Sequence, residues 1–138
     1  MEKIEWKDLR VDEIEFWQPW PALLPLYETL RDKLVERYPD LRIKVSKTQI
    51  SFYNRHMFAM ASGPWRRKKD WPRQFMLVSF GLAHRLDSPR VAMASEPYPC
   101  RWTHHVLVER KEQINAELLS WIDEAYRFSN QKRRKEKV

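Results

Sequence analysis

The sequence predicts an α+β fold, in which an antiparallel β-sheet of about five strands is covered on one face by an N-terminal and a C-terminal helix. Three observations support this class. Apolar residues recur at helical spacing after Pro21, alternate with polar residues from position 41 onward, and return to helical spacing near the C-terminal end. The length predicts a single α+β domain over 21–129, preceded by an arm at 1–20 and followed by a basic disordered tail at 130–138.

The N-terminal region divides into an arm and a helix. The arm mixes acidic and aromatic side chains in no clear period, so we expect it to be irregular and packed on the domain. In the following helix, apolar residues recur every third or fourth position from Leu23 to Leu34. Pro25 suits the first turn, where its missing N–H needs no partner. The helix should end at Tyr38, because the residue before a proline is disfavoured in the α region.

Alternation of period two predicts the strands, which are bounded by turn-forming residues. The segments are LRIKV at 41–45, QISFY at 49–53, HMFAMAS at 56–62, QFMLVSF at 74–80, RVAMAS at 90–95 and WTHHVLV at 102–108. Between the third and fourth segments, prolines and a glycine bracket a charged stretch that cannot continue a sheet, so we expect a long exposed loop. A second amphipathic helix should run from about Lys111 to Ser129.

The net charge of +7 is concentrated in two short segments. RRKKDWPR at 66–73 and KRRKEK at 132–137 each carry four net positive charges, which leaves the rest of the chain close to neutral. The basic character therefore belongs to one loop and one tail. A short basic run of this kind is also typical of a solvated surface segment.

Several function classes are excluded by what the sequence lacks. Two glycines in the whole chain cannot build a glycine-rich phosphate loop, so nucleotide and dinucleotide folds are excluded and no cofactor is expected. The apolar runs are too short for a membrane span or a signal peptide. The single cysteine, Cys100, has no partner for a disulfide or a zinc knuckle. We expect a cytoplasmic protein with no membrane partner.

The adjacent histidines in RWTHHV lie on opposite faces of the predicted strand, so they cannot bind one metal ion. His104 shares its face with tryptophan and valine, which predicts a buried, neutral imidazole with a backbone or hydroxyl partner. His105 shares the other face with Arg101 and Thr103, where it meets solvent or a ligand.

The strand face that the helices leave open is the best candidate site, because its cations and hydroxyls suit a phosphate or a carboxylate. The ligand-binding candidates are Lys44, Lys47, Ser51, Tyr53, Arg101, His104 and His105, with Arg42 beside them. The charged loop interleaves basic and aromatic side chains, which is typical of surfaces that bind single-stranded nucleic acid. Its candidates are Trp65, Arg66, Arg67, Lys68, Lys69 and Trp71. No catalytic triad and no metal site is recognisable.

Four segments carry a family resemblance: KTQISFY at 47–53, HMFA at 56–59, RWTHHVLV at 101–108 and WIDEAYRFS at 121–129. Their order resembles that in a family of small bacterial domains of unknown function. The resemblance implies a compact α+β domain over about residues 22–129, sometimes appended to larger proteins that resemble restriction-type or nucleic-acid-associated systems, and it implies no activity. The matched positions are Lys47, Ser51, Phe52, Trp102, His104, Ala125 and Tyr126. A buried His104 that bonds to a polar group near Ser51 or Tyr126 would satisfy both this pattern and the strand alternation.

The leading interpretation is a non-enzymatic binding or accessory domain that holds an anionic partner, nucleic acid included, on the basic sheet face and loop. Two alternatives remain open. One is a small hydrolase that uses His105 or His104 with Lys47 and Ser51, which requires these groups to converge in a pocket. The other is a protein interaction module that forms a homodimer through exposed tryptophans.

Overall fold

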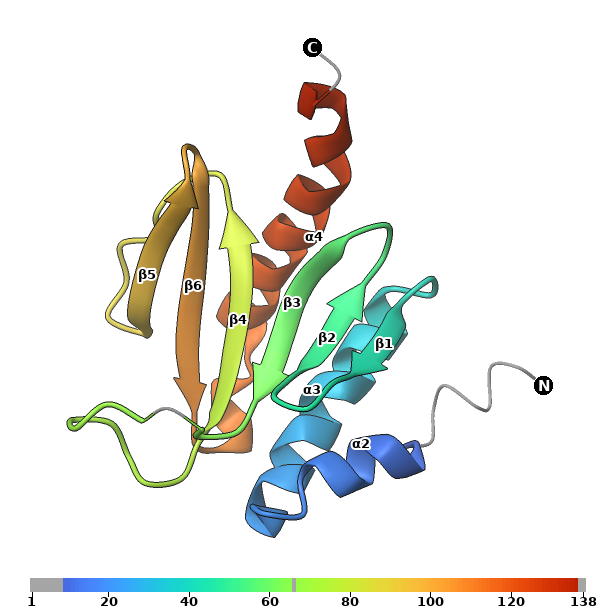
Figure 1. Cartoon of the computed structure of the whole chain (residues 1–138), viewed down its shortest axis with the longest axis vertical. Coiled ribbons are helices and arrows are strands. Elements are labelled where there is room, and N and C mark those ends of the chain that lie inside the picture. Colours follow the sequence, from blue (N-terminus) through green and yellow to red (C-terminus); the bar gives the residue numbers. More distant parts are fainter. Residues whose placement is uncertain (1–8, 66, 137–138) are drawn as a thin grey trace.

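A computed structural model describes residues 9–65 and 67–136 of the chain. It has the predicted α+β class with an antiparallel sheet (Figure 1), but the sheet has six strands, not about five. The elements are α2 (Val11–Phe16), the 3₁₀ helix η1 (Pro21–Leu23), α3 (Leu24–Arg37), β1 (Arg42–Val45), β2 (Ile50–Tyr53), β3 (Met57–Ser62), β4 (Met76–Leu82), β5 (Val91–Tyr98), β6 (Arg101–Val108), the 3₁₀ helix η2 (Lys111–Gln113) and α4 (Ala116–Glu136).

The strand order is β1-β2-β3-β4-β6-β5, so β6 inserts between β4 and β5. All neighbouring strands are antiparallel. β5 forms the edge beyond β6, and its register shifts between Ser95 and Tyr98 around Pro97. An edge strand tolerates a proline because its outward N–H needs no ladder partner. β5 thus covers most of the predicted segment 90–95, extends it to Tyr98 and forms one edge of the sheet.

The N-terminal arm is not irregular as the sequence analysis expected, because it contains α2. Glu13 in the first turn of α2 accepts a hydrogen bond from the backbone N–H of Arg10 at 2.9 Å, and this bond caps the helix. Trp17 directly after α2 is fully buried, with its ring 5.4 Å from that of Tyr27 on α3. Residues 9–20 of the arm are thus folded against the core.

A buried polar cluster fixes α2 to α3. The carboxylate of Glu13 accepts hydrogen bonds from Nε of Arg31 at 2.8 Å and from the hydroxyl of Tyr27. All three residues are fully buried. Burial, together with the Glu13 carboxylate, raises the pKa of Tyr27, so the phenol remains a protonated donor. A carboxylate in this position is stable only because its partners supply charge and hydrogen bonds.

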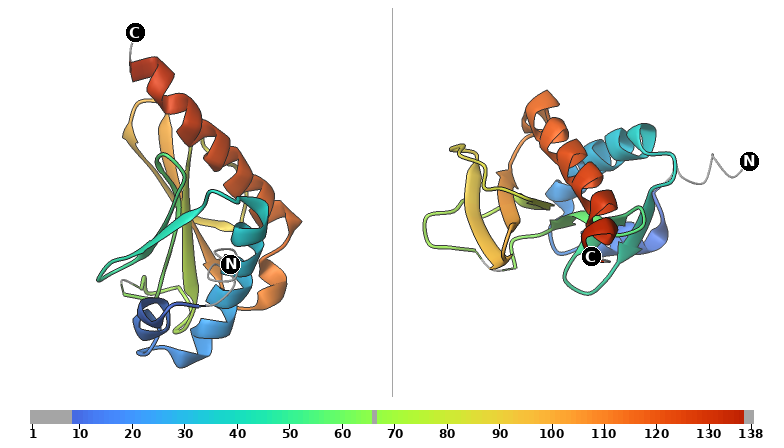
Figure 2. Two further views of the ribbon diagram at one scale, coloured as in Figure 1. Left: turned by 90° about the vertical axis from the view of Figure 1, so that its right-hand side faces the viewer. Right: turned by 90° about the horizontal axis from the view of Figure 1, so that it is seen from above.

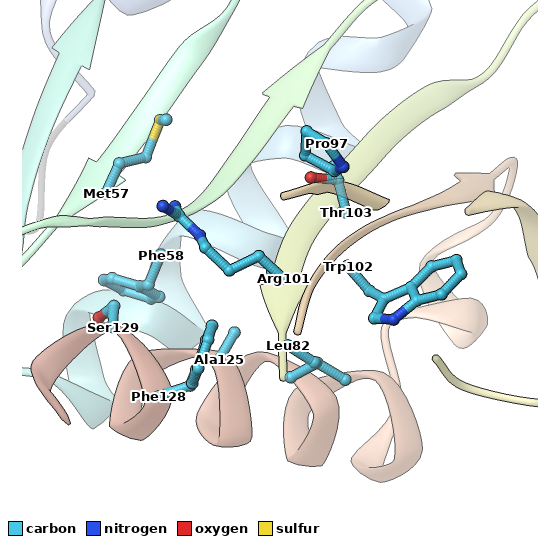
Figure 3. Close-up of a pocket in the computed structure, with 11 residues that line it drawn as sticks. Met57, Phe58, Leu82, Pro97, Arg101, Trp102, Thr103, Ala125, Phe128 and Ser129 are labelled. Carbon is cyan, nitrogen blue, oxygen red and sulfur yellow. The ribbon is translucent and has the colours of Figure 1, made fainter. Parts of the chain in front are cut away.

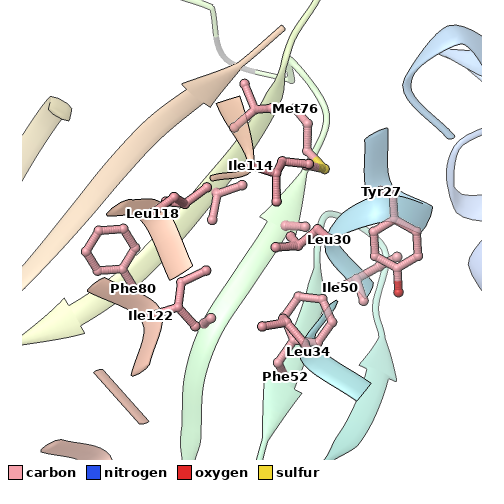
Figure 4. Packing of buried hydrophobic residues seen from close by; sticks show 14 of the residues in the cluster. Tyr27, Leu30, Leu34, Ile50, Phe52, Met76, Phe80, Ile114, Leu118 and Ile122 are labelled. Carbon is pink, nitrogen blue, oxygen red and sulfur yellow. The ribbon is translucent and has the colours of Figure 1, made fainter. Parts of the chain in front are cut away.

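The long helices contact side chains that share one face of the sheet. Tyr27 of α3 stacks on Phe52 of β2 at 6.3 Å, and Trp121 of α4 lies 6.1 Å from Phe80 of β4. The register links Phe52 through Ala59 to Phe80, which places these side chains on the same face. Figure 2 shows α3 and α4 beside the sheet, and Figure 4 shows their apolar side chains packed with those of β2 and β4. The opposite face of the sheet is called the open face below.

The helix ends agree with the sequence in part. Pro25 lies in the first turn of α3, and Tyr38 is its C-cap, as predicted. α4 begins at Ala116 after η2 and continues to Glu136, so it includes residues 130–136 of the segment expected to be a disordered tail. None of the helices in the described ranges is both long and apolar enough to cross a membrane.

Candidate functional site

The open face carries a row of four polar side chains, which Met60 of β3 interrupts and in which both serines are buried. Lys44 of β1 is paired with Ser51 of β2, Ser51 with Met60 of β3, Met60 with Ser79 of β4, and Ser79 with His105 of β6. Directly paired residues in neighbouring strands point to the same face, so these side chains form one line. Lys44 is exposed at one end of the line and His105 is half-buried towards the other.

His105 and Ser79 form a close side-chain pair on the open face. The Ser79 hydroxyl and Nδ1 of His105 are 2.7 Å apart. Burial lowers the pKa of His105, so its imidazole is neutral at neutral pH. Sequence reasoning missed Ser79, because it lies in a strand that reads as apolar on both faces, and only the register brings it opposite His105.

His104 lies on the helix face, as strand alternation predicted. It is fully buried, stacks on Phe80 at 5.4 Å, and accepts a hydrogen bond at Nε2 from the backbone N–H of Leu86 at 2.9 Å. Burial lowers its pKa, against an opposing effect of the Phe80 backbone. The observed partner is this backbone N–H and not a group near Ser51 or Tyr126. His104 holds the loop between β4 and β5 in place.

The groups of the hydrolase alternative do not converge. His104 and His105 point to opposite faces, and three strand-to-strand steps separate Ser51 on β2 from His105 on β6. At about 4.8 Å per step, these two residues are roughly 14 Å apart. Lys47 is exposed in the turn between β1 and β2, farther along the same edge.

The remaining cations of β1 and β2 differ in availability. Arg42 is engaged, because its Nη2 donates to the carbonyl oxygen of Asn54 at 2.6 Å. Lys44 is exposed and forms no ion pair with any carboxylate of residues 9–65 and 67–136. Tyr53 is half-buried and pairs with Arg42 across the strands. Lys44 is therefore a cation of this edge that no carboxylate of the described residues pairs with.

A cleft opens where β3 and β4 diverge. The two strands pair over Ala59–Ser62 and Leu77–Phe80, whereas β3 starts at Met57 and β4 continues to Leu82. The gap holds a small cavity of about 60 Å³ that is open to solvent. Its walls come from β3, β4, β5, β6 and α4 (Figure 3). We call this feature the β3–β4 cleft, and its lining residues are Met57, Phe58, Gly81, Leu82, Pro97, Arg101, Trp102, Thr103, Ala125, Phe128 and Ser129.

Arg101 supplies the positive charge of the β3–β4 cleft. Its side chain is exposed, lies over the ring of Tyr98 at 5.5 Å, and extends across the cleft in Figure 3. Within the described part of the chain, no carboxylate lies within ion-pair distance of it. An exposed guanidinium next to a partly apolar cavity is suited to a planar anion.

The charged loop between β3 and β4 lies at the other end of these strands from the β3–β4 cleft (Figure 1). Trp65 is 50% exposed and packs edge-on against Trp20 at 4.7 Å. Trp71 is less available for stacking on a base, because Lys68 lies over its ring at 5.8 Å and Arg67 donates a hydrogen bond to its backbone carbonyl. Lys69 is exposed. The candidate at position 66 lies outside the described residues.

No cluster of three or more metal-binding side chains forms among the residues whose positions are described.

A model of one protein family matches residues 15–129, which is most of the chain, and that family is described as a domain of unknown function (DUF5655). Neither the curated proteins nor the solved structures gave a significant match. The matched region begins within α2 and includes all six strands.

Proposed function

The chain belongs to the DUF5655 family of domains of unknown function, and from this premise we propose that it is a small binding domain that holds an anionic ligand at the open face of its sheet. One observation carries the proposal. Arg101 is an exposed cation at the edge of a cleft, and no carboxylate of the described ranges neutralises it. A guanidinium that is not occupied by the protein's own acids can form a bidentate pair with a carboxylate or a phosphate.

Neighbouring groups on the open face add hydrogen-bonding capacity. Thr103 precedes His105 by two residues on β6, so the two side chains point to the same side as Arg101. When the Ser79 hydroxyl donates to Nδ1 of His105, the Nε2–H of the neutral imidazole is free to donate to a ligand. This combination favours binding over catalysis, because no carboxylate orients the imidazole within the described chain.

Nucleic acid bound by the charged loop is the second candidate. It is favoured by the half-exposed ring of Trp65 beside exposed Arg67, Lys68 and Lys69. Trp71 weakens this candidate, because one side of its ring is already covered by a lysine of the loop. A basic loop with a single available aromatic ring is a smaller stacking platform than single-stranded nucleic acid usually uses.

The two alternatives from the sequence have less support. The hydrolase requires His105, Ser51 and Lys47 to meet, and the strand order separates them. The homodimer was expected to use several exposed tryptophans, but Trp65 is the one exposed tryptophan among the described residues. The other large exposed apolar side chains are Val11, Ile14, Met57 and Tyr98, and they come from α2, β3 and β5.

Backbone amide NMR of the intact chain tests the proposal with a built-in control. The chain has two glycines, and they lie at opposite ends of the sheet: Gly81 lines the β3–β4 cleft and Gly63 begins the charged loop. Acetate or inorganic phosphate, added at low salt, should shift the Gly81 resonance and leave Gly63 in place. Arg101→Gln should weaken this binding by about 10- to 100-fold, which is the usual value of a hydrogen bond to a charged group.

The matched control is Arg37→Gln, which removes an exposed arginine at the end of α3 and should leave binding unchanged. The proposal fails if no small anion moves Gly81 at millimolar concentration, or if both arginine variants behave alike. A short single-stranded oligonucleotide that shifts Gly63, and loses this effect at higher salt, would favour the second candidate.

A further inference from the structure

We infer that the β3–β4 cleft receives the apolar part of the ligand, so that the natural ligand is a small monocarboxylate with a short apolar chain. The inference rests on the proposed function, because it uses the same arginine for the anionic group. It adds a second requirement, which is an apolar chain on the ligand. The geometry of the gap, its lining and its single cation support this ligand class.

The cleft is an interruption inside the sheet, not at its edge. Beyond the pair of Ala59 with Phe80, β3 continues to pair with β2 and β4 continues to pair with β6, but the two strands are not paired with each other. Met57 pairs with Tyr53, and Gly81 pairs with Thr103. The diverging strands therefore form two walls, which are each fixed by a neighbouring strand on the far side.

The side of the cleft towards α4 carries apolar side chains, whereas the cleft as a whole exposes polar and apolar surface in about equal amounts. Phe58 and Leu82 are buried on the two strands, and α4 contributes Ala125 and Phe128 below them (Figure 3). The hydroxyl of Ser129 is already engaged, because it donates to the carbonyl oxygen of Tyr126. A hydrocarbon chain that enters this gap loses contact with water and meets apolar side chains, which is favourable.

Gly81 keeps the cleft open. A Cβ atom built at this position would meet the Trp102 carbonyl oxygen at 3.8 Å, an ordinary contact, and no closer atom. The backbone of Gly81 also has no positive φ that would exclude other residues. A larger side chain here would therefore occupy the space that we assign to the ligand, without straining the strand.

The charge of the cleft favours a single carboxylate over a polyanion. Arg101 is the one cationic side chain in the lining, and its planar guanidinium matches the two oxygens of a carboxylate. Thr103 lies two residues along the same strand and supplies one hydroxyl beside it. A monocarboxylate would thus place its carboxylate at the open face and its hydrocarbon chain towards α4.

The test compares acetate, butyrate and hexanoate, with hexylamine as a probe of opposite charge, and follows the Gly81 and Gly63 resonances of the intact chain. Each methylene added to the ligand should tighten binding by about three- to fourfold until its hydrocarbon chain reaches α4. Hexylamine should not bind. Gly81→Val, followed at the Thr103 amide, should weaken the binding of every carboxylate, because its side chain would fill the entrance of the cleft beside Thr103, whereas Gly81→Ala should weaken this binding only in part. An unshifted Gly63 resonance verifies that both variants are folded.

The results separate this inference from the proposed function. If acetate and hexanoate bind equally well and both depend on Arg101, the apolar subsite is wrong and the anion-binding function stands. If hexanoate binds Gly81→Val as tightly as it binds the unchanged protein, the hydrocarbon chain lies elsewhere and the inference is also wrong. If none of the carboxylates moves Gly81, both proposals are overturned.

Discussion

Removing the buried carboxylate of Glu13 should destabilise the domain strongly. The exposed fraction of the side chain is 0% for both Glu13 and Arg31, and the N–O distance between them is 2.8 Å. Glu13→Ala removes the acceptor for three donors at once, which are the Arg10 backbone, the Tyr27 hydroxyl and the Arg31 guanidinium. Breaking a buried ion pair from one side typically costs about 3–5 kcal/mol, because a charge remains in a site with little water.

For a chain of this size, such a loss corresponds to a fall in Tm on the order of 10–20 °C. Chemical denaturation monitored by tryptophan fluorescence measures it directly, since Trp17 lies buried beside the cluster. Glu13→Gln should have an intermediate effect, because it retains an acceptor oxygen but removes the charge. Asp12→Ala is the matched control: the Asp12 side chain is 54% exposed on the same helix, and its loss should cost less than about 1 kcal/mol.

The reasoning would be refuted if Glu13→Ala lowered the free energy of unfolding by less than about 1 kcal/mol, because the carboxylate would then not be essential to the core. An effect of the same size for Asp12→Ala and Glu13→Ala would be equally damaging. It would mean that the helix α2 is sensitive to any loss of acidic charge, and that the buried geometry is not the cause.

Two further predictions concern glycine and pH. Gly63→Ala should destabilise the fold, because a Cβ atom at this position would lie 2.4 Å from the indole ring of Trp20, whereas Gly81→Ala should be nearly neutral. Thermal melts compare the two variants, and equal Tm values would contradict the steric argument. His104 and His105 both have lowered pKa values, so the unfolded chain takes up protons first and stability should fall as pH drops below about 6.5, by at most ~1.4 kcal/mol per pH unit for each histidine. The pKa of His84 is raised by the Glu124 carboxylate, so this histidine acts in the opposite direction. Unfolding curves at several pH values measure the net dependence of stability on pH, and His104→Gln should make this dependence weaker.

Local sequence patterns were sufficient for much of the fold. Alternation along RWTHHV predicted which histidine would be buried, because side-chain direction in a strand depends only on position. Pro25 and Tyr38 were predicted at the ends of their helix from the steric properties of proline alone. These are local rules, and no knowledge of the tertiary structure was needed to apply them.

The missed features depend on contacts between distant residues. Glu13 reads as one of several acids in a polar arm, and its burial follows only when Arg31, eighteen positions later, lies next to it. The pair of Ser79 and His105 requires the knowledge that β4 is adjacent to β6. The β3–β4 cleft depends on where two strands stop pairing, and no residue type marks that point in the sequence. Of the ligand-binding candidates chosen from the sequence, Arg101 is the one that lines this cleft, and the cavity itself was not predicted.

The divergence of β3 and β4 has a mechanical consequence. One leaf of the sheet consists of β1, β2 and β3, the other of β4, β6 and β5, and they are joined along the short ladder from Ala59 to Ser62. α4 packs against both β3 and β4, so it connects the two leaves across the short ladder. Any change in the angle between the leaves has to deform this ladder or slide α4. Amide hydrogen exchange at Ala59–Ser62 consequently reports how rigidly the two leaves are held together.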